Sequence, residues 1–118
     1  MLAAPEFAAW LASLPLAGRM AVAVDLEVLR AAGPQLGRPQ VDHIKGSRHA
    51  NMKELRTTSG GHAYRTLFAF NPARRAVILV GGDKSGQHQE RFYKTLIKQA
   101  DAIYDRHLDR MKKGRTKP

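Results

Sequence analysis

Residues 63–70 constrain the fold more strongly than any other part of the sequence. Aromatic and β-branched side chains recur there at every second position, as in a strand with one buried face, and the residues expected on that face are Tyr64, Thr66, Phe68 and Phe70. Gly60 and Gly61 precede this segment, and a Gly-Gly pair favours a two-residue hairpin turn because glycine readily adopts positive φ. Residues 52–57 carry a weaker strand pattern before the turn. The sequence therefore predicts an antiparallel hairpin.

Two helices are expected ahead of the hairpin. Pro5 suits the start of the first helix and Pro15 ends it, and its apolar face is formed by Phe7, Trp10, Leu11 and Leu14. A second apolar stripe predicts a helix over residues 17–32, which Gly33-Pro34 stops. An irregular, basic stretch then leads to the hairpin.

After the hairpin, the apolar run 77–80 predicts a buried strand, and residues 81–86 a flexible loop. A last helix is expected from about residue 89, with a buried face of Phe92, Leu96, Ala100, Ile103 and Tyr104. We therefore expect one α+β domain over residues 1–118, with two N-terminal helices packed on a small antiparallel sheet of three to four strands and a C-terminal helix. The basic tail at about 112–118 is expected to be disordered.

The charge of the chain indicates a polyanionic partner. Lys and Arg number 20 against 10 acidic residues, for a net charge of +10, and the excess lies after residue 30. A general solubilising role is the simpler alternative. The absence of cysteine excludes disulfides and thiolate metal sites. No apolar run of about 18 residues predicts a membrane span, and no signal segment is evident, so we expect a cytoplasmic protein.

The hairpin places three charged residues together. With Gly60-Gly61 at the turn, Arg56 lies opposite Arg65, although like charges repel there. Arginine forks suit two-point contacts with phosphate, so the pair is a candidate anion site. Glu54 shares their face and could act as a base or simply neutralise them. We expect Arg65 to point away from the helix-packed core, so that Arg65→Ala leaves folding nearly intact.

Other candidate residues surround this pair. Lys84 lies in a glycine-rich loop that lacks the spacing of a P-loop, and Arg91 and Tyr93 open the last helix. His49 could donate a proton or only form a turn. The five histidines are scattered without the spacing of a zinc helix, so no metal is expected.

Five short motifs, in this order and spacing, resemble the HigB-type branch of the RelE/ParE toxin superfamily. They are Lys-Gly-Ser-Arg at 45–48, Glu-Leu-Arg at 54–56, Tyr-Arg-Thr-Leu-Phe at 64–68, Gly-Asp-Lys-Ser-Gly at 82–86 and Glu-Arg-Phe-Tyr at 90–93. The resemblance covers the chain from about residue 7 to residue 108.

The resemblance implies a RelE-like fold and a toxin of a type II toxin–antitoxin system that cleaves mRNA, usually on the ribosome. It also implies a cognate antitoxin, often of the helix-turn-helix type, and no cofactor or metal. Cleavage would proceed by attack of the ribose 2′-hydroxyl on the adjacent phosphate. The residues expected to catalyse it are Glu54, Arg56, Arg65, Lys84 and Tyr93. The residues expected to bind RNA are Lys45, Arg48, His49 and Arg91.

Two departures from the family are visible. RelE-branch toxins carry lysines on the first hairpin strand, where this chain has Met52 and Glu54, so Glu54 is the favoured base. The family also opens with an edge strand, which is expected to be missing or very short here because only four residues precede Pro5. Two alternatives stay open: a ParE-like toxin that inhibits gyrase without nuclease activity, and a non-catalytic nucleic-acid-binding module.

Overall fold

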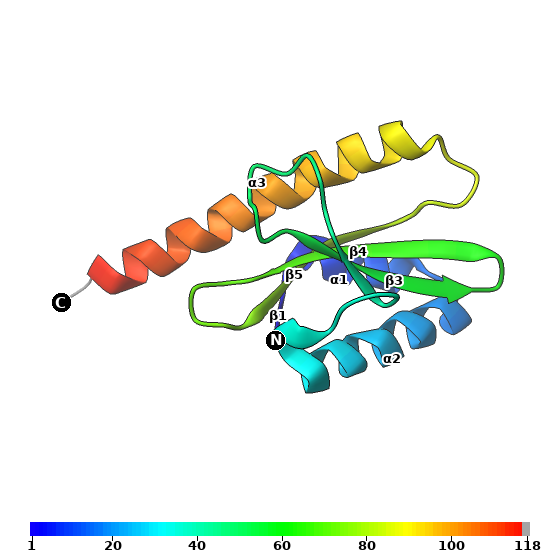
Figure 1. The fold of residues 1–118 in the computed structure, drawn as a ribbon, viewed down its shortest axis with the longest axis horizontal. Coiled ribbons are helices and arrows are strands. Elements are labelled where there is room, and N and C mark those ends of the chain that lie inside the picture. Colours follow the sequence, from blue (N-terminus) through cyan, green and yellow to red (C-terminus); the bar gives the residue numbers. More distant parts are fainter. Residues whose placement is uncertain (117–118) are drawn as a thin grey trace.

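A five-stranded sheet lies between two helices on one face and one long helix on the other (Figure 1). The computed structural model describes residues 1–116. The strands lie in the order β1-β5-β4-β3-β2. The short β1 pairs with β5 in parallel, and every other neighbouring pair is antiparallel. The strand bounds are β1 Leu2–Ala3, β2 Val41–His43, β3 Lys53–Ser59, β4 His62–Phe70 and β5 Ala76–Asp83.

The predicted hairpin is confirmed as β3 and β4. Gly60 and Gly61 form its turn with φ angles of 54° and 81°, which other residues rarely adopt. The register places Arg56 directly opposite Arg65, as the turn predicts. The face that the alternation marks as buried is indeed buried, with Tyr64 and Phe68 in the core.

Helices α1 (Pro5–Ser13) and α2 (Leu16–Ala32) pack on this face, and a short 3-10 helix, η1 (Gly33–Gln35), follows them. The predicted stripes of both helices supply their contacts with the sheet. The fully or nearly buried residues of this core are Phe7, Val22, Leu29, Val41, Leu55, Tyr64, Phe68, Ala76 and Ile78. The outer side of α2 leaves four large apolar residues exposed, Leu16, Met20, Val24 and Val28.

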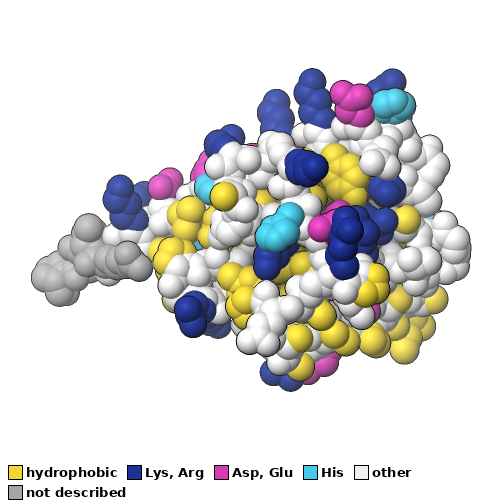
Figure 2. All heavy atoms as spheres, viewed as in Figure 1, with side chains coloured by type: hydrophobic (Ala, Val, Ile, Leu, Met, Phe, Trp, Pro, Cys, Tyr) yellow, Lys and Arg dark blue, Asp and Glu magenta, His cyan; other side chains and the backbone are white. Residues whose placement is uncertain are grey.

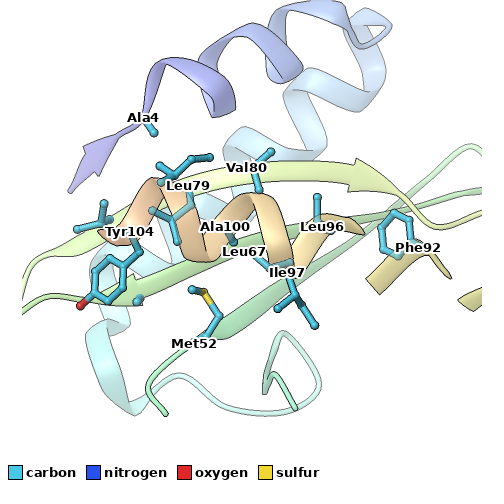
Figure 3. Close-up of a cluster of buried hydrophobic side chains, with 13 residues drawn as sticks. Ala4, Met52, Leu67, Leu79, Val80, Phe92, Leu96, Ile97, Ala100 and Tyr104 are labelled. Atoms are coloured by element: carbon cyan, nitrogen blue, oxygen red, sulfur yellow. The ribbon is translucent and has the colours of Figure 1, made fainter. Parts of the chain in front are cut away.

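Helix α3 (Gln89–Thr116) covers the opposite face and closes a second core (Figures 1 and 3). Its predicted apolar stripe is confirmed, since Phe92, Leu96, Ala100, Ile103 and Tyr104 are all buried. They pack against Met52, Leu67 and Leu79 from the sheet. The expected α+β architecture is therefore confirmed, with one strand more than the upper estimate.

The glycine-rich segment differs from the expected loop, because β5 continues through Gly81 and Gly82 to Asp83. A Cβ on Gly81 would lie 2.3 Å from the Trp10 ring, and one on Gly82 would lie 2.9 Å from the Phe92 ring. The glycines therefore let an aromatic side chain of a covering helix pack against the strand backbone. Close approach, rather than loop flexibility, accounts for the pair.

Three further elements differ from expectation or refine it. The edge strand β1 is present but only two residues long, paired through Leu2 with Val77 and Ala3 with Ile78. Strand β2 was not predicted, because its three residues are too few for an alternation to be visible. Helix α3 continues to Thr116, so the prediction of a disordered tail is wrong for residues 112–116; the lysines and the arginine there favour helix. Residues 117 and 118 lie outside the described part.

Among residues 1–116, no helix has the length and apolar character needed to cross a membrane.

Candidate active site

Glu54 is the buried centre of the candidate site. It lies on β3 and pairs with Leu67 of β4, so its side chain shares the face that α3 covers. Only 5 % of the side chain is exposed. A carboxylate this enclosed requires hydrogen-bond donors or positive charges close by. Arg56, Arg65 and Tyr93 supply them.

The two arginines approach Glu54 from neighbouring strands. Nη2 of Arg56 lies 3.3 Å from Oε2 of Glu54, and Nε of Arg65 lies 3.5 Å from Oε1. Arg65 is more enclosed than a surface charge, with 11 % of its side chain exposed, whereas Arg56 is 37 % exposed. Both guanidinium Nε atoms are buried without a hydrogen-bond acceptor in the described part of the chain. The pair therefore neutralises Glu54, and the Arg65 contact is an ion pair without hydrogen-bond geometry.

Tyr93 joins the cluster from the first turns of α3. Its hydroxyl donates a hydrogen bond to Oε1 of Glu54 across 2.7 Å. Partial burial and the neighbouring Glu54 carboxylate raise the pKa of Tyr93 above its usual value, so the phenol keeps its proton at neutral pH. Nζ of Lys84 lies 5.9 Å from the centre of the Tyr93 ring. The backbone N–H of Lys84 bonds to the carbonyl of Ala63, which fixes the start of the loop after β5.

The cluster lines an open hollow of about 430 Å³ between β2, β3 and the start of α3. The hollow collects five of the sequence-predicted site residues, Lys45, Glu54, Arg56, Lys84 and Tyr93. Arg65 lies beneath it, through its contact with Glu54. Figure 2 shows a group of Lys and Arg side chains in the middle of this face, around an acidic one.

Among the residues of the hollow that were not predicted are two charged ones, Arg38 and Asp42. Asp42 lies opposite Glu54 on β2 and accepts hydrogen bonds from Arg38 and, across 3.3 Å, from Arg56. The Arg38 guanidinium and the backbone N–H of His43 hold the pKa of Asp42 below its usual value. Recognising β2 in the sequence would have placed Asp42 beside Glu54.

Three predicted RNA-binding residues lie apart from this cluster. His49 contacts Asp105 across 2.7 Å and lies edge-on against Tyr104, and these contacts join its loop to α3. Arg48 pairs with Asp105 as well. Arg91 lines a different hollow, beside Gly81 and Gly82.

The arrangement is suited to a phosphodiester. A buried carboxylate can accept a proton, and the surrounding cations can stabilise charge that develops on phosphate oxygens. Within residues 1–116, no three His, Asp or Glu side chains gather in a way that could hold a metal ion.

Residues 9–105 match the family model described as Phage derived protein Gp49-like. HigB2 of Mycobacterium tuberculosis is 45% identical over 104 residues, which cover 87% of this chain and 51% of HigB2. HigB3 of the same organism is 42% identical over 97 residues, 82% of each chain. Both are named as candidate toxins. The chain thus spans about half the length of HigB2 and most of HigB3.

The fold has a counterpart among solved structures. A chain in the crystal structure of a RelB-RelE antitoxin–toxin complex from Methanococcus jannaschii superposes with a TM-score of 0.54 at 18% identity, over 80% of this chain and 98% of that chain. This similarity identifies the fold as RelE-like. The chain therefore belongs to the Gp49-like family and is related over most of its length to the HigB-type toxins, on a RelE-like fold.

Proposed function

We propose that this protein is the toxin of a type II toxin–antitoxin system and acts as a metal-free mRNA endoribonuclease. One observation carries the nuclease part of the proposal: a buried carboxylate, Glu54, lies between two arginines and a tyrosine hydroxyl at the edge of an open, cationic hollow. The family membership supports the toxin part.

In the proposed reaction, Glu54 takes the proton of a ribose 2′-hydroxyl. The 2′-oxygen then attacks the adjacent phosphorus, the bond from phosphorus to the 5′-oxygen breaks, and the products are a 2′,3′-cyclic phosphate and a 5′-hydroxyl. Arg56 and Lys84 are placed to stabilise the negative charge that grows on the phosphate oxygens. Arg65 holds the Glu54 carboxylate from below.

The 5′-oxygen must receive a proton as it leaves. Tyr93 and Lys84 both reach the hollow, and the raised pKa of Tyr93 keeps its phenol protonated at neutral pH. His49 contacts Asp105 and Tyr104 and does not line this hollow, so Tyr93 and Lys84 are the donors that we propose. Comparing Tyr93→Phe with Lys84→Ala distinguishes the two donors, because only loss of the true donor should be rescued by an RNA with a better leaving group.

The ribosome is the proposed site of cleavage. The hollow is open to solvent, so an external scaffold would help to align the RNA in it. Positioning alone can contribute about 7–11 kcal/mol in favourable cases. Cleavage of free RNA is therefore expected to be much slower than cleavage of ribosome-bound mRNA.

The proposed partner is a cognate antitoxin, often of the helix-turn-helix type in this family. The solved relative in the RelB-RelE complex supports such a partner. The net charge of +10 favours an antitoxin with an acidic contact segment, whose association would weaken as salt rises.

The test is cleavage of mRNA by the purified protein with intact ribosomes, with the new RNA ends identified. We expect a 2′,3′-cyclic phosphate and cleavage that persists when EDTA is added at a concentration below that of magnesium, which removes zinc and manganese and keeps the ribosomes intact. Glu54→Gln is the matched inactive control, because it keeps the side-chain shape. Growth arrest without RNA cleavage would contradict the nuclease and favour a ParE-like action on gyrase.

A further inference from the structure

A second, larger hollow adjoins the candidate active site. It measures about 630 Å³ and shares Lys45 and Tyr93 with the first. The two hollows are therefore neighbours, with Lys45 and Tyr93 at their common border, and we call them together the groove; the second hollow lies along the N-terminal half of α3. Figure 2 shows Lys and Arg side chains standing along this part of the helix.

Lys94 and Lys98 line the new part of the groove. They lie one turn apart on α3, about 6 Å along its axis, and both are exposed. Neither has a hydrogen-bond or ion-pair partner among residues 1–116. Both ammonium groups are thus available to a ligand. Ile97 and Tyr93 lie beside them and give the groove an apolar floor.

The acidic residues of this hollow do not cancel the two lysines. Asp101 is buried and already accepts hydrogen bonds from the Ser47 hydroxyl and the backbone N–H of Arg48. Glu90 lies four residues before Lys94 on α3, and it and Asp101 are the two acidic residues of this lining, against four basic ones, Lys45, Arg48, Lys94 and Lys98. The groove therefore keeps a net positive charge around Lys45, Lys94 and Lys98.

We propose that this second hollow binds the sugar–phosphate backbone of single-stranded RNA next to the cleaved bond, with Lys94 and Lys98 contacting phosphates. The inference rests on the proposed function, because the hollow adjoins the proposed cleavage site. A nucleic-acid backbone fits better than an acidic peptide, since the groove includes a cluster suited to a phosphodiester. Contacts of this kind contribute affinity without reading sequence.

The test measures binding without cleavage. A fluorescent RNA oligonucleotide with 2′-O-methyl groups cannot be cut through its 2′-oxygens, and its anisotropy gives the dissociation constant over a range of salt concentrations. Lys94→Gln/Lys98→Gln is compared with Arg74→Gln/Arg75→Gln, which removes the same charge from exposed positions in the turn between β4 and β5. Thermal unfolding checks that both variants fold.

We expect the lysine variant to bind every RNA sequence more weakly than the parent. The slope of the logarithm of the association constant against the logarithm of the salt concentration should become less negative by about 1.4, which corresponds to the loss of two phosphate contacts on a single strand. The arginine variant should keep the parental slope. Equal slopes in the two variants, or no binding by the parent, would overturn the inference. This binding assay measures no cleavage, so a change of slope would support RNA binding by Lys94 and Lys98 even if the nuclease assay failed. Cleavage by the parent together with equal slopes would refute the binding role of these lysines and leave the proposed nuclease activity intact.

Discussion

Arg56 and Arg65 face each other directly across β3 and β4, and the carboxylate of Glu54 lies within 3.5 Å of both guanidinium groups. Two like charges in a cross-strand pair repel each other, but here a shared buried counter-charge compensates. The three side chains therefore form one electrostatic unit, and replacing any one of them changes the charge that surrounds the other two.

This unit predicts that Arg65→Ala destabilises the protein, contrary to what the sequence suggests. Removing Arg65 leaves the buried Glu54 with one guanidinium, and we expect a loss of about 1–3 kcal/mol in the free energy of unfolding. In a Glu54→Gln background the same substitution should cost less, because the amide carries no charge. Urea unfolding of the two single variants and the double variant measures the coupling. If Arg65→Ala lowers the free energy of unfolding equally in the parent and in Glu54→Gln, the Glu54–Arg65 ion pair contributes nothing to stability.

Arg65→Lys separates charge from shape. An ammonium keeps the positive charge but cannot reproduce the fork of the guanidinium, so we expect stability near that of the parent and only partial activity. Because Arg65 holds the Glu54 carboxylate, Arg65→Ala would let the proposed base shift, and a shift of about 1 Å can lower the rate by about a hundred-fold. Ribosome-dependent cleavage rates at matched folded fractions give the comparison. Full toxicity of a well-folded Arg65→Ala protein would contradict a role in catalysis.

Tyr93 makes stability depend on pH at the alkaline end. Partial burial and Glu54 raise the pKa of Tyr93 in the folded state. The hydrogen bond to Glu54 therefore stabilises the fold fully at pH values below the usual tyrosine pKa of about 10. This stabilisation is lost as the pH rises through the pKa of the folded state. Across this pH range, the free energy of unfolding measured with denaturant should therefore fall more steeply for the parent than for Tyr93→Phe. If the free energy of unfolding changes with pH in the same way for the two proteins, the Tyr93 hydrogen bond does not cause the pH dependence.

Gly81→Ala should destabilise the fold by about 1–3 kcal/mol. The new Cβ would lie 2.3 Å from the ring of Trp10, which must move out of the core between α1 and β5. The control is Gly114→Ala in α3, where a Cβ meets nothing within 4 Å and alanine favours helix. Denaturant unfolding with Trp10 fluorescence reports both the stability and the ring environment.

Periodicity predicted the elements that have enough residues to display it. The stripes of α1, α2 and α3, the hairpin and the Arg56–Arg65 register all followed from local spacing and turn chemistry. Strand β2 could not be predicted in this way, because its position depends on pairing with β3. Asp42 was missed with it. The role of Gly81 was also invisible, since it depends on Trp10, far away in the sequence.

The site residues were predicted in part. The pairing of β3 with β4 joined Glu54 to the two arginines, whereas the family resemblance supplied Lys84 and Tyr93. The sequence could not tell that the loop around Arg48 and His49 folds onto Asp105 of α3, because that contact joins residues more than fifty positions apart.

Strands β3 and β4 send alternate residues to opposite faces, so that Leu55 enters the core of α1 and α2 while Glu54 and Arg56 face α3. A single-residue deletion or insertion within β3 would exchange the two sets, placing charges in the core and a leucine in the site. Insertions of one residue should therefore be lethal to function within residues 53–58 and far better tolerated in the turn at Gly60-Gly61. Length variation among natural and selected variants of this hairpin is thus expected to be confined to its tip.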